Sequence, residues 1–155
     1  MEEQVFLARV AEQAERYEDM VEYLEKGVVL KNGEEFTSDE RKLLSVGFKN
    51  LIGSERGAIR TIGAIEEKEK YAQFAGSLKA YKKQIETGLY DKCKRVIACV
   101  NKCLECAKDD DSKAFFYKMI GDYFRYGVES AHDQILEECK TGALEGYKKS
   151  LEYSN

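Results

Sequence analysis

Proline and tryptophan are both absent from this chain of 155 residues. A proline inside a helix removes a backbone hydrogen bond and clashes with the preceding turn, so a proline-free chain of this length favours long helices. Histidine is scarce too, since His132 is the only one and no serine or cysteine motif surrounds it. No glycine-rich phosphate loop follows a strand-like segment. These absences argue against an enzyme, and the sequence predicts no cofactor.

Long apolar runs are missing as well. None approaches the roughly 20 residues of a membrane-spanning helix, and the opening segment MEEQVFLARVAEQ lacks the layout of a secretion signal. The formal net charge of -4 disfavours a general binder of nucleic acid or of anionic membranes. Five cysteines without a secretion signal indicate reduced thiols, and we expect a cytoplasmic protein.

Apolar residues recur at helical spacing along almost the whole chain, and no stretch alternates with period two for long enough to predict a strand. The length suits one domain, so residues 1–155 are expected to form a single all-α domain, an antiparallel helical bundle. Six helical stretches are predicted, at about residues 3–15, 17–28, 37–67, 71–107, 113–126 and from 133 onward.

Local signals place the boundaries between these helices. Thr37 followed by Glu40 is a capping-box pattern, which predicts a helix start there. Asn32-Gly33 marks a turn before it, and the acidic residues from Asp109 predict a solvated loop and a helix N-cap. In the fourth stretch, apolar residues recur in threes and fours, which is typical of a helix packed antiparallel on a neighbour. These residues are Tyr71, Phe74, Leu78, Tyr81, Ile85 and Leu89.

The stretch from Leu43 to Arg60 carries a core face and a row of cations. At about 100° per residue, Lys49, Arg56 and Arg60 fall on one side of a helix, because their spacings are seven and four. Neighbouring like charges repel along a helix, so an anion lying across them would explain the row. A solvated basic face is the other interpretation, and the spacing alone leaves both open.

A second informative stretch runs from Lys118 to Glu129. Asp122 precedes Arg125 by three residues and Glu129 follows it by four, so either acid can brace the guanidinium along a helix. With the hydroxyl of Tyr126 alongside, the braced arginine forms an oriented donor pair that suits a phosphate oxygen. An intrahelical ion pair beside a core tyrosine remains the alternative.

Three of the cysteines have the spacing of an iron–sulfur motif. Cys99, Cys103 and Cys106 form C-x3-C-x2-C, the spacing with which radical S-adenosylmethionine enzymes hold a cluster. Here they lie in a strongly helical run, Glu105 stands where that family usually has an aromatic residue, and the strand–helix alternation of a β/α barrel is lacking. A zinc site that includes His132 has little support. Thiols of a core or an interface on one helix face are expected instead, with no bound metal.

Three segments resemble the 14-3-3 proteins: AEQAERY at residues 11–17, LLSV followed by Lys49-Asn50, and GDY followed by Arg125-Tyr126. The resemblance extends from the first helix to near the end of the chain. That family is all-helical, forms cup-shaped dimers and binds phosphoserine or phosphothreonine motifs in a groove. The resemblance implies a phosphate pocket made of Lys49, Arg56, Arg125 and Tyr126. Near the groove we further expect Arg60, Lys118, Asp122 and Glu129.

The resemblance also implies a dimer, in which the first helix of one subunit packs on the third and fourth helices of its partner. Residues 1–35 and 38–107 are expected to form this dimerisation region. Its apolar seam matches Val10, Ala14, Ala58, Ile62, Ile65 and Tyr81. Arg16 and Asp19 match positions that pair with the fourth helix in the family, but Gly88 and Gln84 stand at the partner positions, so those charge pairs are lost. Ala58 replaces a serine whose phosphorylation breaks the dimer in some members.

The chain departs from the family by ending about where the sixth of nine helices would end. The remaining part normally supplies an asparagine that holds the peptide backbone and the apolar side chains of the opposite groove wall. We therefore expect uncovered apolar residues on the last two helices, such as Phe116, Leu144 and Leu151.

Two functional hypotheses follow. The first is a non-catalytic adaptor that binds phosphorylated client proteins or peptides and pairs with itself or with related chains, with no nucleic-acid or membrane partner. The second is a structural or regulatory dimerisation module, in which phosphopeptide binding is weak or absent because one groove wall is missing.

Overall fold

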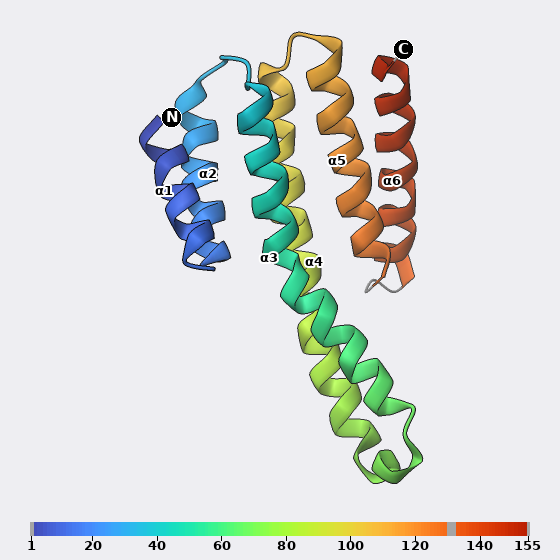
Figure 1. Ribbon diagram of the computed structural model, residues 1–155. Coiled ribbons are helices and arrows are strands. Elements are labelled where there is room, and N and C mark those ends of the chain that lie inside the picture. The colour runs from blue at the N-terminus through green and yellow to red at the C-terminus, as the bar shows by residue number, and fades with distance from the viewer. Residues whose placement is uncertain (1, 130–132, 155) are drawn as a thin grey trace.

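The computed structural model describes residues 2–129 and 133–154, and in this part of the chain every regular element is a helix (Figure 1). The all-α prediction is therefore confirmed. The elements are α1 (Glu2–Gln13), α2 (Tyr17–Lys31), α3 (Ser38–Glu66), the 3-10 helix η1 (Glu69–Phe74), α4 (Ala75–Cys106), α5 (Asp110–Val128) and α6 (Asp133–Ser154).

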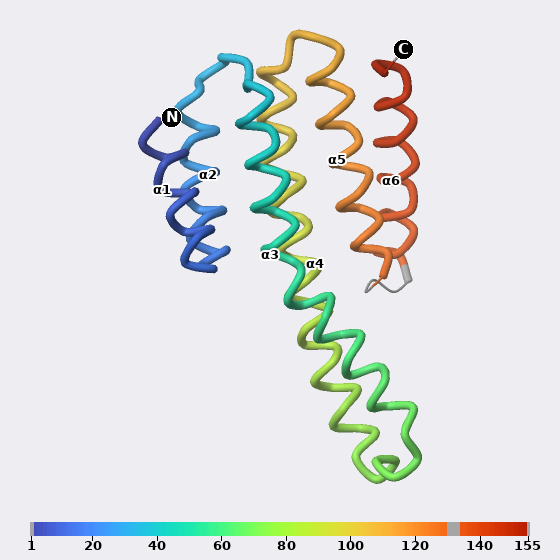
Figure 2. The backbone as a smooth tube through the Cα atoms, in the orientation of Figure 1, coloured from blue at the N-terminus to red at the C-terminus, as the bar shows by residue number. Residues whose placement is uncertain are grey.

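Helices that follow one another in the sequence lie next to one another in space (Figure 2). The backbone runs up and down through the array, from α1 and α2 past α3 and α4 to α5 and α6. The hairpin of α3 and α4 is longer than its neighbours and projects beyond them, with η1 at its tip (Figure 1). We call residues 58–88 the arm. The remaining helical segments form the array, which holds most of the core.

The predicted helix boundaries are confirmed where a side chain caps the backbone. Thr37 Oγ1 accepts a hydrogen bond from the backbone N–H of Glu40 at 3.1 Å, and Glu40 Oε1 accepts one from the N–H of Thr37 at 2.9 Å. This reciprocal pair satisfies two backbone donors at the start of α3. Asp109 caps α5 by accepting from the N–H of Ser112 at 2.7 Å. The turn before α3 uses Gly33, whose φ of 94° favours glycine.

One apolar core runs through the array, because α2, α3, α4 and α5 each turn a stripe of buried side chains inward. Its largest fully buried members are Met20, Val21, Leu24, Leu44, Phe48, Ile52, Leu89, Val96, Val100 and Phe116. These stripes fix the rotation of each helix, so the opposite face of α3 and one edge of α5 remain for polar side chains.

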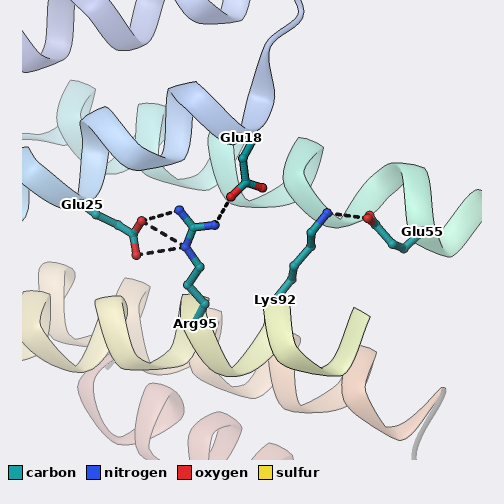
Figure 3. Close-up of polar contacts among 5 residues, drawn as sticks. All are labelled: Glu18, Glu25, Glu55, Lys92 and Arg95. Carbon is teal, nitrogen blue, oxygen red and sulfur yellow. Dashed lines mark hydrogen bonds and ion pairs between the residues drawn. The ribbon is translucent and has the colours of Figure 1, made fainter. Parts of the chain in front are cut away.

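Ion pairs tie α4 to two of its neighbours (Figure 3). Arg95 on α4 lies between Glu18 and Glu25 of α2, and its Nη2 is 2.6 Å from Glu25 Oε1. One turn earlier on α4, Lys92 pairs with Glu55 of α3. Hydrogen bonds to Glu25 and then to Glu18 raise the pKa of Arg95. These partly buried pairs add polar contacts at the edge of the core that the apolar pattern does not supply.

Helices α5 and α6 approach so closely that glycine is required between them. A Cβ atom on Gly146 would lie 2.7 Å from the backbone nitrogen of Gly121, and one on Gly142 would lie 2.6 Å from the ring of Phe124. Real Cβ atoms essentially never make such contacts, so larger residues would push the two helices apart. The close approach gives α6 a fixed position against α5.

Two sequence expectations are wrong. The fourth helix was expected to begin near Tyr71, but that residue lies in η1, because the chain must reverse direction at the tip of the arm before α4 begins at Ala75. Phe116 was expected to be uncovered, but it is fully buried beneath Phe36, with 5.9 Å between the ring centroids. Leu144 and Leu151 are exposed, as expected.

Candidate functional site

The two informative stretches of the sequence face each other across a cavity of about 330 Å³ between α3 and α5. Helix α3 contributes Ser45 and Lys49, one turn apart on its polar face. Helix α5 contributes the rest of the wall. Its lining residues are Phe115, Lys118, Met119, Asp122, Tyr123, Arg125 and Tyr126. Because the cores of α3 and α5 pack together through Phe48 and Tyr123, with ring centroids 6.2 Å apart, their polar edges are held side by side.

Lys49 is exposed and forms no ion pair with any residue in the described part of the chain. Its neighbours Leu51 and Ile52 are buried, so the helix rotation that fills the core also directs Lys49 to the cavity. A lysine in this position supplies a positive charge that is not already neutralised by a nearby carboxylate.

Arg56 lies beside the cavity and is held from two sides. Its Nε and Nη2 donate to the two carboxylate oxygens of Glu129 at 3.1 and 3.0 Å. Its guanidinium also stacks over the ring of Tyr126, with 4.3 Å from Cζ to the ring centroid. The sequence spacing allows Glu129 to pair with Arg125 on the same helix, but in the structure Glu129 pairs with Arg56 of α3.

Arg125 is more exposed than Arg56 and is held less tightly. Its nearest carboxylate is Asp122, with 3.9 Å between Nη2 and Oδ1, and its side chain is 58% exposed, against 27% for Arg56. Its guanidinium lies 5.2 Å from the centroid of the Tyr126 ring. Tyr147, then Tyr126 and Asp122, raise the pKa of Arg125. The sequence spacing allowed either Asp122 or Glu129 as the acid beside Arg125, and in the structure Asp122 is the nearer one.

Asp122 has two further partners. Lys118 donates to Oδ2 at 3.4 Å from the same helix. Tyr147 of α6 donates its hydroxyl to Oδ1 at 2.6 Å. Burial, followed by this hydrogen bond, raises the pKa of Tyr147 to about 12, so the hydroxyl keeps its proton at neutral pH. This contact could not be predicted from the sequence, because Tyr147 follows the apolar spacing of α6 like any core residue.

Arg60, the third cation of the predicted row, lies outside this cavity. Its Nε donates to the backbone oxygen of Arg56 at 3.4 Å. Its side chain lines a shallower depression on the arm, together with Glu66 and Lys82. The structure thus brings Lys49, Arg125 and Tyr126 together at the cavity, sets Arg56 at its edge and leaves Arg60 one helical turn away.

The cysteines lie in the interior of the protein. All five are free and buried. A hydrogen bond with Cys99 and burial raise the pKa of Cys103, and burial raises the pKa of Cys93 to about 12, so neither thiol is activated. Within the described ranges, no group of three or more histidine, cysteine or acidic residues is placed to hold a metal ion. His132, considered as a zinc ligand, lies outside the described residues.

The residues expected at a dimer interface are spread over α1 and the arm. Val10, Ala14 and Tyr81 are exposed, whereas Ala58 and Ile65 are half-buried and Ile62 is buried within the chain. Arg16 pairs with Asp19 of its own chain, with 2.5 Å between Nε and Oδ2. Within residues 2–129 and 133–154, no helix combines the length and apolar character needed to cross a membrane.

Known proteins are similar to this chain over almost its whole length. The family model described as "14-3-3 protein" matches residues 7–155. The chain is 42% identical to 14-3-3 protein 5 of Solanum lycopersicum over 158 aligned residues, which cover 99% of this chain and 62% of that protein. It is 42% identical to checkpoint signal transducer rad25 of Schizosaccharomyces pombe, covering 95% of this chain and 55% of that protein. The chain thus spans about three fifths of the length of these relatives.

Proposed function

The chain belongs to the 14-3-3 protein family, and from this premise we propose that it is a non-catalytic adaptor that binds phosphoserine or phosphothreonine segments of client proteins. The observation that carries the proposal is the cavity between α3 and α5, where Lys49 and Arg125 line one space with Tyr126. A role in signal transduction and a cytoplasmic location belong to the same proposal.

The charges around the cavity favour a phosphate monoester. Its lining residues include the three cations Lys49, Lys118 and Arg125 but a single acid, Asp122. A phosphorylated serine carries a charge of about -1.5 to -2 near neutral pH and three acceptor oxygens. In the proposed complex, Lys49 supplies a point charge, Arg125 donates from its guanidinium, and the hydroxyl of Tyr126 donates a hydrogen bond.

Arg56 completes the proposed site from the edge of the cavity. A guanidinium has five N–H donors, and the two nitrogen atoms that bind Glu129 leave donors on Nη1 and Nη2 for a ligand. The stacking on Tyr126 limits rotation of the side chain, so less conformational entropy is lost when phosphate binds. Glu129 in this arrangement orients Arg56, and Arg60, Lys118 and Asp122 are accessory residues of the groove.

A second component of the proposed function is dimerisation. The observation that favours it is the exposure of large apolar side chains on α1 and on the arm, including Phe6 at 64% and Tyr81 at 55%. We propose that residues 1–35 and 38–107 form a dimer region, with a second copy or a related chain as the partner. Its contacts would include Val10, Ala14, Arg16, Ala58, Ile62, Ile65 and Tyr81.

The binding proposal is tested by fluorescence polarisation with a phosphoserine peptide and its unphosphorylated form. We expect phosphate-dependent binding that falls at least tenfold in Lys49→Ala, because that variant removes a charge without leaving a partner carboxylate unpaired. Lys42→Ala is a matched control, since Lys42 is exposed on the same helix but lies outside this cavity. We expect Arg56→Ala to lose binding as well. If the double variant Arg56→Ala and Glu129→Gln binds more tightly than Arg56→Ala alone, part of that loss comes from the unpaired negative charge of Glu129.

Equal binding of the two peptides by a folded, helical protein would reject the adaptor proposal and favour a dimerisation module.

The dimerisation proposal has its own test, which is the molar mass by light scattering at micromolar concentration. We expect twice the chain mass, and the mass of one chain in Tyr81→Glu, because a buried unpaired carboxylate opposes association. A single-chain mass for the unmodified protein would reject the dimer.

A further inference from the structure

The two arginines of the proposed phosphate site differ in how strongly each is already engaged. Arg56 forms a two-bonded fork with Glu129, with both distances at or below 3.1 Å. Arg125 has an acid one helical turn away, yet the shortest contact to Asp122 is 3.9 Å, which is beyond a hydrogen bond. The carboxylate of Asp122 is therefore not closed on Arg125.

The carboxylate oxygen nearest to Arg125 already accepts a hydrogen bond from another residue. Asp122 Oδ1, the atom nearest to Arg125, accepts the hydroxyl of Tyr147 at 2.6 Å. The other oxygen, Oδ2, faces Lys118. A short hydrogen bond from a hydroxyl to a carboxylate belongs to the stronger class, so it competes well with a surface ion pair for the same oxygen.

The position of Tyr147 is set by the backbone of α5. A Cβ atom on Gly121 would lie 2.9 Å from the Tyr147 ring, so the ring packs directly on the helix at the residue before Asp122. The neighbouring contact between Gly146 and Gly121 fixes α6 at that depth. The close packing of α6 on α5 therefore holds the hydroxyl against Asp122, and the Tyr147 ring has little freedom to rotate away.

We infer that Tyr147 is a positioning residue of the phosphate site, which occupies Asp122 Oδ1 and so keeps the guanidinium of Arg125 available to an anionic ligand. This inference rests on the proposed function, because its readout is phosphate binding. It assigns to α6 a part in a site whose lining comes from α3 and α5.

The test is a double-mutant cycle with the same phosphoserine peptide. Tyr147→Phe keeps the ring on Gly121 but removes the hydroxyl, and we expect about fivefold weaker binding as Asp122 closes on Arg125. Asp122→Asn removes the competing charge, and in that background Tyr147→Phe should change the affinity less than twofold. Tyr153→Phe is the matched control, because Tyr153 lies on the same helix and stacks on Tyr117, with 5.7 Å between ring centroids.

Each outcome decides the inference. Unchanged or tighter binding by Tyr147→Phe would overturn it while leaving the adaptor proposal intact. An equal loss in the Asp122→Asn background would show that the hydroxyl acts through packing, which also overturns it. Failure of the unmodified chain to distinguish the phosphorylated from the unphosphorylated peptide would overturn the adaptor proposal and this inference with it. Circular dichroism and thermal unfolding of each variant establish that the compared proteins are folded.

Discussion

The α5–α6 pair and the arm are both formed by two antiparallel helices, but their glycines lie in different surroundings. Between α5 and α6, glycines bring the backbones into contact, and no space remains for a Cβ atom at Gly121, Gly142 or Gly146. In the arm, a Cβ atom on Gly63 or Gly76 would meet nothing within 4 Å. The interface between α5 and α6 is therefore closely packed, whereas these two glycines of the arm face open space.

The difference separates two kinds of function. A binding site for a small anion needs side chains held at fixed distances, and the proposed phosphate site lies where α5 is fixed by its neighbours. A surface for another protein needs exposed apolar side chains on an accessible element, and the arm provides these at Phe74 and Tyr81.

The largest contrast is expected from removing one aromatic ring in each region. Phe116 is fully buried in the array and Phe74 is 52% exposed at the tip of the arm. Phe116→Ala should lower the free energy of unfolding by about 3–5 kcal/mol, because it leaves a cavity that the array cannot close. Phe74→Ala should change it by less than about 0.5 kcal/mol. Urea unfolding followed by circular dichroism measures both variants. Similar losses of stability in the two would contradict the expected difference between the array and the arm.

Adding one methyl group should change stability in opposite directions in the two regions. Gly146→Ala should destabilise the protein by about 1–3 kcal/mol, since the new Cβ atom meets the backbone nitrogen of Gly121 at 2.7 Å. Gly63→Ala should stabilise it by about 0.5–1 kcal/mol, because alanine is the better helix former and the space is open. Thermal unfolding of the two single variants decides this, and a stabilising Gly146→Ala would contradict the close packing of α5 and α6.

The smallest effect concerns pH and the connection between α2 and α3. Glu40 pairs with Lys31 at 2.7 Å, and although burial opposes ionisation, the bonds from Lys31 and Thr37 lower the pKa of Glu40 overall. A lowered pKa in the folded state means that the stabilisation is present above the ordinary carboxyl value of about 4.3 and is lost as pH falls through the folded value.

Glu40→Gln should therefore lower the free energy of unfolding by about 1–2 kcal/mol at pH 7. The stability of this variant should also fall less steeply than that of the unmodified chain as the pH is lowered. The matched change on the arm is Glu66→Gln, which breaks the 2.8 Å pair with the more exposed Lys82 and should cost less. Urea unfolding between pH 3 and pH 7 measures both variants. A pH dependence in Glu40→Gln as steep as in the unmodified chain would contradict the role of this pair.

Much of the fold could be read from the sequence, because its signals are local. The capping pattern of Thr37 and Glu40, the turn at Asn32-Gly33 and the N-cap at Asp109 all appear in the structure as predicted. Apolar spacing placed the helices because a helix repeats every 3.6 residues regardless of what surrounds it. The exception is the tip of the arm, where helical spacing continued through η1 although the chain turns there.

The candidate site was only partly predictable. Spacing placed Lys49 and Arg56 on one face of α3 and Arg125 beside Tyr126 on α5, and the resemblance to the 14-3-3 proteins joined the two sets. Spacing along one helix says nothing of contacts to another, so it missed the pairing of Arg56 with Glu129, 73 residues apart.

The sequence by itself determined the helices, their caps, the cations on each helix face and the family. Only the tertiary structure decided which acid each arginine meets, that Phe116 is buried, and that Tyr147 reaches Asp122. The physical reason is range: helix formation depends on residues up to four apart, whereas contacts between helices depend on the depth and rotation at which they pack. Those are set here by glycines and core side chains that lie far apart in the chain.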